Sequence, residues 1–144
     1  MDARKYLERL RALDNQIDAL IRRQTELIET LALLRSMDYT KDRVQVSPDG
    51  GAGYEKTVEK VVDSEAEIAH LIDELVDMKR EAEVYIEQMD KPEEKQILRY
   101  RYLLNFKFEQ IAEVMSYTER HIYNLHNDAL VSFQESLDKG EAAR

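Results

Sequence analysis

The chain has 144 residues, of which 43% are hydrophobic and 35% charged, and its net charge at pH 7 is −9. With only four Gly and two Pro, this composition favours long helices with charged outer faces over a β-sandwich or an α/β sheet. The absence of Cys excludes disulfides and Cys-based zinc sites.

Two further properties bound the class of protein. Met1 is followed by charged sequence rather than by the apolar core of a signal peptide. No apolar run approaches the roughly 18 residues that cross a bilayer. We therefore expect a soluble, cytoplasmic protein with no membrane partner. Residues 1–90 carry 13 Lys and Arg against 21 Asp and Glu, whereas residues 91–144 carry 8 against 9, so the acidity lies mainly in the first part.

Residues 3–38 carry a regular heptad pattern. Its positions, spaced alternately by three and four, are Ala3, Tyr6, Leu10, Leu13, Ile17, Leu20, Gln24, Leu27, Leu31 and Leu34. The pattern is typical of a coiled coil and also of an amphipathic helix in a globular bundle. A second apolar stripe at Leu7, Ile21 and Ile28 widens the apolar face.

A loop is predicted over residues 39–53, because Pro48, Gly50, Gly51 and Gly53 are turn and breaker residues. The heptad spacing then returns from Tyr54 to Met89, and Glu65 and Ile72 are among its positions. Two long helices joined by a loop most simply form an antiparallel hairpin, here residues 1–90. Such a hairpin would bring the polar seam residues Gln24 and Glu65 near each other.

Lys91-Pro92 marks the next boundary, because Pro disfavours helix before it and favours the first turn after it. The pattern predicts a helix over 92–103 and two short helices after it, within a unit over 91–137. We expect the tail, residues 138–144, to fray.

The most informative stretch runs from Phe108 to Leu125. One apolar face is formed by Ile111 and Met115 with small Ala112 beside them, and a polar break follows at 116–118. A second apolar face then returns at Ile122 and Leu125. This spacing is that of a helix-turn-helix, whose second helix enters the major groove of DNA.

Residues 92–134 resemble region 4 of the bacterial sigma-70 family. The matching residues are Pro92, Ile97 to Tyr102, Glu109 to Ala112, Thr118, Ile122, Ala129 and Leu130. The whole chain looks like a member of the ArpU-type transcriptional regulators of phages and prophages. This resemblance implies an all-α fold, with a long coiled-coil-like hairpin followed by a small three-helix unit, and a bacterial host cell.

The resemblance also implies roles for individual residues. Thr118 would cap a recognition helix over about 118–131. The candidates for reading bases are Glu119, Arg120, Tyr123 and Asn124, and those for contacting the DNA backbone are Arg101, Lys107, Thr118 and His121. Arg pairs with guanine, Asn with adenine, and Glu accepts from cytosine.

This chain departs from the family pattern at four positions, one of which is Lys107, where the family usually has a Ser or Thr cap. Asn105 and Ser116 replace glycines, and a positive φ at Ser116 would cost on the order of 1 kcal/mol. Glu119 stands where sigma factors commonly place a basic residue, and its charge repels phosphate.

Other side chains admit two interpretations. Tyr100, Tyr102, Phe106 and Phe108 could stack on bases, but their helical spacing is more typical of a core. His121 and His126 are five residues apart, which does not place both on one helix face for a metal, so we expect surface histidines and no metal. The sequence contains no arrangement of residues typical of a catalytic site. We therefore expect that the protein is not an enzyme and binds no cofactor.

The leading hypothesis is a sequence-specific transcriptional regulator that binds double-stranded DNA as a homo-dimer. The self-association candidates are Leu10, Ile17, Ile21, Ile28, Val62, Ile68, Leu75 and Val76. The alternative is an adaptor that docks on RNA polymerase or another phage factor without reading DNA. A structural or packaging phage protein with a helix-turn-helix is a third interpretation.

Overall fold

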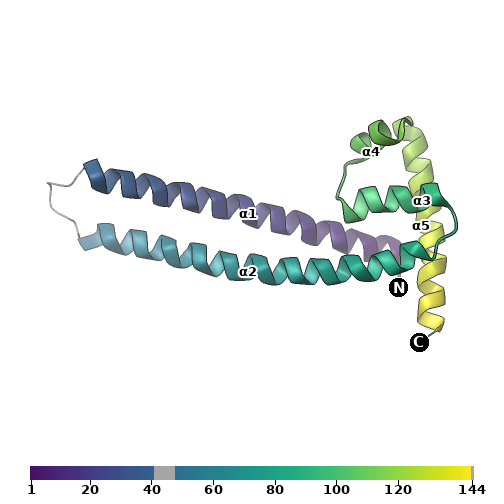
Figure 1. The fold of residues 1–144 in the computed structure, drawn as a ribbon, viewed down its shortest axis with the longest axis horizontal. Helices are drawn as coiled ribbons and strands as arrows, with labels where there is room; N and C mark the ends of the chain where they lie inside the picture. Colours follow the sequence, from purple (N-terminus) through teal and green to yellow (C-terminus); the bar gives the residue numbers. More distant parts are fainter. Residues whose placement is uncertain (41–47, 144) are drawn as a thin grey trace. The chain divides into compact units, whose positions relative to one another are not determined.

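The computed structural model describes residues 1–40 and 48–143, and the regular elements in those ranges are all helical. In chain order they are α1 (Ala3–Thr40), α2 (Pro48–Glu87), α3 (Pro92–Leu98), the π-helix η1 (Arg99–Leu103), α4 (Phe108–Met115) and α5 (Glu119–Ala142). The long helices α1 and α2 form a hairpin-like pair (Figure 1). The prediction of an all-α fold with a long helical hairpin is confirmed.

The chain divides into two compact units. Asn15–Asp73 forms one, called here the hairpin unit, and Met1–Asp14 with Glu74–Arg144 forms the other, called the core unit. The division therefore passes through both long helices and does not coincide with the predicted boundary near residue 90. The first turns of α1 belong to the same unit as the predicted helix-turn-helix.

In the hairpin unit, α1 faces α2 with the predicted seam. Leu20, Gln24, Leu27, Leu31 and Leu34 are half-buried. The seam on α2 differs from the prediction, because Glu65 and Ile72 are exposed and Ser64 and Leu71 are half-buried instead. Gln24 borders a shallow hollow that Lys60 and Ser64 also line.

In the core unit, α5 adds a third layer to the α1 and α2 segments. The Phe133 ring of α5 is fully buried, with its centroid 5.7 Å from the ring of Tyr6 and 6.1 Å from that of Tyr85. The side chains of Leu7 and Ile86 are also fully buried. Aromatic side chains of this size supply much of the buried apolar area of a small core.

The predicted helix over 92–103 is present, but its last five residues wind as the π-helix η1. It begins at Pro92 as expected, with Glu93 and Glu94 in its first turn. The Leu104 N–H donates to the Arg99 carbonyl at 2.9 Å, the wider spacing that defines a π-turn.

Both ends of the predicted loop and the predicted tail are helical. α1 continues to Thr40 and α2 begins at Pro48, so the loop prediction over 39–53 is wrong at its ends, and residues 41–47 lie outside the described residues. α5 continues to Ala142 because Leu137 is buried and because Glu141 pairs with the amino terminus of Met1 at 3.3 Å. The predicted tail is therefore mostly part of α5.

Candidate nucleic-acid interface

The stretch from α4 to α5 has the backbone of a helix-turn-helix. α4 ends at Ser116, whose φ of 58° and ψ of 41° lie in the left-handed region. The Tyr117 N–H donates to the Ala112 carbonyl at 3.0 Å, which satisfies a free carbonyl of the last turn. Thr118 then caps α5, since its Oγ1 accepts from the His121 N–H at 3.2 Å.

The entry to α4 is fixed by a second left-handed residue, Asn105, with φ of 57°. Its Oδ1 accepts from Nε of Arg11 at 2.9 Å, so a side chain of α1 holds this turn. Gln110 accepts from the Lys107 N–H at 2.9 Å, which caps α4 without a Ser or Thr at its first position. Asn105 and Ser116 are thus both in the conformation for which glycine is preferred.

The inner face of α5 is anchored as the sequence predicts. Ile122 is fully buried, Leu125 is half-buried, and Ala129, about two turns after Ile122 on the same face, is also fully buried. From α4, Ile111 and Ala112 are buried against it. These contacts hold the first turns of α5 at a defined angle to α4.

His126 is buried, which corrects the expectation of a surface histidine. Only 4% of it is exposed, and its Nε2 is 2.7 Å from the hydroxyl of Tyr102, with which it shares a hydrogen bond. Burial, with the charges of Arg101 and Arg4, lowers the pKa of His126 to about 4. This histidine is therefore neutral at pH 7 and belongs to the core. His121, in contrast, is exposed as expected.

All four base-reading candidates point into solvent. Glu119, Arg120, Tyr123 and Asn124 are exposed, and the Tyr123 ring packs against that of Phe108 with centroids 4.8 Å apart. Asn127 is exposed on the same face, three residues beyond Asn124, and sequence reasoning missed it. The i, i+3, i+4 spacing would have been sufficient to find it.

The four candidates for contacts with the DNA backbone differ in how exposed their side chains are. Lys107, Thr118 and His121 are exposed, and the His121 ring packs on Tyr117 with centroids 4.3 Å apart. Arg101 is half-buried: its Cζ lies 3.8 Å from the centroid of the Phe108 ring, and its Nη1 donates to the Phe106 carbonyl at 3.1 Å. The predicted core role of the neighbouring aromatic residues holds for Tyr102, which is fully buried.

The charge of the helix-turn-helix is unlike that of most DNA-binding surfaces. From residue 107 to residue 128 the chain carries two basic residues, Lys107 and Arg120, and four acidic ones, Glu109, Glu113, Glu119 and Asp128. An acidic surface repels the phosphates of DNA.

The self-association candidates fall into two groups. Leu10, Ile17, Ile68 and Leu75 are buried inside the chain's own units, so the single chain does not expose them for association. Ile21, Ile28 and Val62 in the hairpin unit, and Val76 in the core unit, are exposed. Burial distinguishes them because the first group lies on the seam and the second lies beside it.

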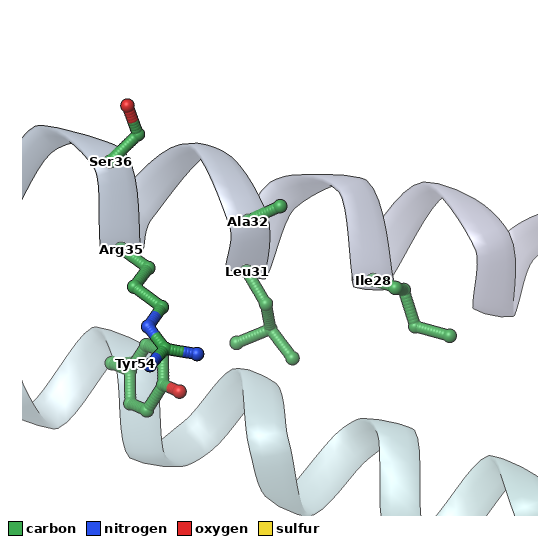
Figure 2. A pocket seen from close by; sticks show the side chains of 6 residues that line it. All are labelled: Ile28, Leu31, Ala32, Arg35, Ser36 and Tyr54. Atoms are coloured by element: carbon green, nitrogen blue, oxygen red, sulfur yellow. The ribbon is translucent and has the colours of Figure 1, made fainter.

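One exposed part of the hairpin unit is hollowed and mainly apolar. Figure 2 shows the side chains of Leu31 and Arg35 directed from α1 toward α2, near Tyr54, while Ser36 points away. Ile28 and Ala32 complete the lining of this hollow.

Comparisons with protein-family models, curated proteins and solved structures found no match to this chain. Within residues 1–40 and 48–143, no helix is long and apolar enough to span a membrane. Over the same ranges, no group of three or more His, Asp or Glu side chains is placed to hold a metal ion.

Proposed function

We propose that the chain is a sequence-specific DNA-binding transcriptional regulator of phage or prophage origin, which reads the major groove with the first turns of α5. One observation carries the proposal. Glu119, Arg120, Tyr123, Asn124 and Asn127 form a continuous exposed polar face on a helix whose opposite face is buried. A recognition helix needs this division between an anchored side and a free side.

The chemistry of this face suits direct readout of bases. Arg120 has the donors for guanine O6 and N7, and Asn124 has the donor and the acceptor that adenine requires. Each such bidentate pair contributes about 1–3 kcal/mol of discrimination against the wrong base. Thr118, Lys107 and His121 are exposed close to this face in the sequence and supply donors for phosphates.

The test begins with selection of bound duplexes from random oligonucleotides. Arg120→Ala and Asn124→Ala should each weaken binding to the enriched duplex by roughly 10- to 100-fold and leave binding to a scrambled duplex nearly unchanged. Arg22→Ala is the matched control, because Arg22 is exposed in the hairpin unit. If both variants keep the affinity and the sequence preference of the parent chain, α5 is not a recognition helix.

The acidic residue Glu119 offers a gain-of-function test of the same proposal. Glu119→Lys removes a repulsive charge from the reading face and adds an attractive one, so it should tighten binding to all duplexes and steepen the dependence on salt. Glu59→Lys makes the same charge change at an exposed position of the hairpin unit. At low salt, the affinities of the two variants for duplex DNA should differ by about tenfold if α5 lies against DNA.

Homo-dimerisation is the second part of the proposal, since a near-neutral or acidic reader gains affinity from two half-sites. Ile21 and Ile28 lie seven residues apart on α1, and Val62 and Ile72 lie on the corresponding flank of α2 in an antiparallel pair. The other flank is charged, with Arg23, Lys60, Asp63 and Glu67 around its hollow. The apolar flank is therefore the side of the hairpin unit on which a second copy would bury apolar area.

Light scattering of two matched variants tests the dimer. Ile28→Glu places a charge on the apolar flank, and Leu33→Glu places one on a neighbouring exposed leucine that lies off it. We expect the first to give monomers at concentrations where the parent chain and Leu33→Glu are dimeric. A parent chain that is monomeric at high concentration contradicts this part.

The acidity of the helix-turn-helix favours a second candidate function, an adaptor that docks on RNA polymerase or another phage factor. An adaptor of this kind binds no duplex even at low salt, whereas a reader that contacts phosphates loses affinity steeply as salt rises. Titration of a fluorescent duplex at several salt concentrations, beside a binding assay with purified RNA polymerase, separates the two functions.

A further inference from the structure

A group of basic side chains lies beside the proposed reading face, and part of it comes from α1. Nε of Arg11 donates to the side chain of Asn105, and Nη1 of Arg101 donates to the carbonyl of the next residue, Phe106. The two guanidinium groups are therefore held at adjacent residues of one turn. Arg4, one α-helical heptad before Arg11, lies on the same face of α1.

This arginine cluster, Arg4, Arg11 and Arg101, has no ion-pair partner within the described residues. Arg99 shows the contrast, because its Nη2 lies 2.6 Å from Glu83 and 2.8 Å from Glu87. Arg11 and Arg101 are both half-buried. Burial and the charge of Arg11 lower the pKa of Arg101, as expected for two like charges held together away from water.

Other groups around the cluster do not neutralise it. Glu8 is the acidic residue whose charge acts on Arg101 and Tyr102, so one acidic charge stands against the three arginines of the cluster. The neighbouring titratable groups of η1 and α5 are Tyr102 and His126, which are buried and uncharged at pH 7. The site thus keeps a net positive charge in a chain whose total is −9.

Two ring contacts connect the cluster to the reading face. The guanidinium of Arg101 lies over the ring of Phe108, and that ring packs against Tyr123 of α5. The cluster is therefore one aromatic side chain away from a proposed base-reading residue. Phosphates border the major groove on both sides, so a helix in the groove brings its neighbours close to them.

We infer that Arg11 and Arg101 together hold one phosphate of the DNA backbone, with Arg4 beside them, while the first turns of α5 lie in the major groove. The inference rests on the proposed function and assigns α1 a part in DNA binding. A guanidinium fork matches the oxygens of a phosphate, and the anion would offset the repulsion between the two half-buried cations. The arginine cluster also supplies the attraction for phosphate that the acidic helix-turn-helix lacks.

The test measures the salt dependence of duplex binding for Arg11→Gln and Arg4→Gln, with Arg22→Gln as the control on the same helix. Each of the first two should weaken binding to enriched and scrambled duplexes by the same factor, about fivefold, and reduce the slope of log K against log salt by about 0.9. Arg22→Gln should change neither quantity. Arg11→Lys keeps the charge and a donor for Asn105, so it should retain the slope of the parent chain.

Three results would overturn the inference, and they separate it from the proposed function. If Arg120→Ala impairs binding but Arg11→Gln and Arg4→Gln leave the slope unchanged, the cluster is not a phosphate site and the reading helix stands. If Arg11→Gln weakens only the enriched duplex, Arg11 contacts a base. If the parent chain binds no duplex at low salt, both proposals are wrong. Arg4→Gln guards against a folding artefact, since within residues 1–40 and 48–143 Arg4 hydrogen-bonds through its backbone N–H, to Asp2, and not through its side chain.

Discussion

The hairpin unit and the core unit use the same heptad pattern and bury it to different extents. In the core unit Leu7 and Leu10 of α1 are at most 1% exposed, whereas in the hairpin unit Leu20, Leu27 and Leu31 are only half-buried. The difference arises because the core unit contains α3, η1 and α5 beside its α1 and α2 segments, whereas the hairpin unit, Asn15–Asp73, consists of α1 and α2 segments. Two helices by themselves leave both flanks of their seam in water, and a third layer is needed to close a core.

The largest expected effect follows directly from this difference. Phe133→Ala removes the ring at the centre of the core unit and should cost about 3–5 kcal/mol, whereas Leu27→Ala in the hairpin unit should cost on the order of 1 kcal/mol. Hydrogen exchange of the α5 amides and of residues 15–37 measures the two units separately. Equal costs would contradict the contrast in burial.

Acid should destabilise the core unit through its buried histidine. The pKa of the buried His126 is about 4, well below the ordinary value of 6.5, so the unfolded chain binds a proton more readily than the folded one. Stability from this group is complete above about pH 6.5 and falls by about 1 kcal/mol per pH unit as the pH drops toward 4.

Denaturation curves between pH 7 and pH 4 measure this loss. His126→Gln should flatten the pH profile relative to the parent chain, because it removes the buried imidazole. An unchanged profile in His126→Gln would mean that other groups cause the acid sensitivity.

Substitution of two glycines by Ala should change the stability in opposite directions. A Cβ on Gly140 of α5 would lie 2.6 Å from the buried ring of Tyr85, so Gly140→Ala should destabilise the core unit by about 1–3 kcal/mol. A Cβ on Gly53 of α2 meets nothing within 4 Å, so Gly53→Ala should gain up to about 1 kcal/mol of helix propensity. Thermal melts of both variants test the signs, and stabilisation by Gly140→Ala would show that Tyr85 moves aside readily.

The smallest effects concern threonines that bond to the backbone. Thr118→Ala removes the cap of α5 in the core unit and should cost about 1 kcal/mol. The Thr25 hydroxyl donates to the Ile21 carbonyl within α1, so Thr25→Ala should cost nothing and gain about 0.5 kcal/mol of helix propensity. In urea titrations, the unfolding midpoints of the two variants should therefore shift in opposite directions from that of the parent chain.

Much of the candidate site could be predicted because its chemistry is local. The spacing of Ile111, Ile122 and Leu125 predicts the two helices, and Thr118 predicts where the second begins. The left-handed backbone at Asn105 and Ser116 is expected from the resemblance, which places glycines at these two positions, and Asn tolerates positive φ. These features depend on a few consecutive residues, so the order of residues alone determines them.

Tertiary contacts decided which side chains are buried and which are grouped. His126 is an ordinary polar residue in the sequence, and only the position of Tyr102 makes it part of the core. Arg11 lies 94 residues from Asn105, so its place beside the helix-turn-helix appears only when α1 packs in the core unit. By itself the sequence determined the helices, the seam of α1, the cap at Thr118 and the turn between α4 and α5, because backbone preference and hydrophobic periodicity act within one segment. The length of α5, the burial of the seam and the arginine cluster required the third helical layer, whose contacts no local pattern records.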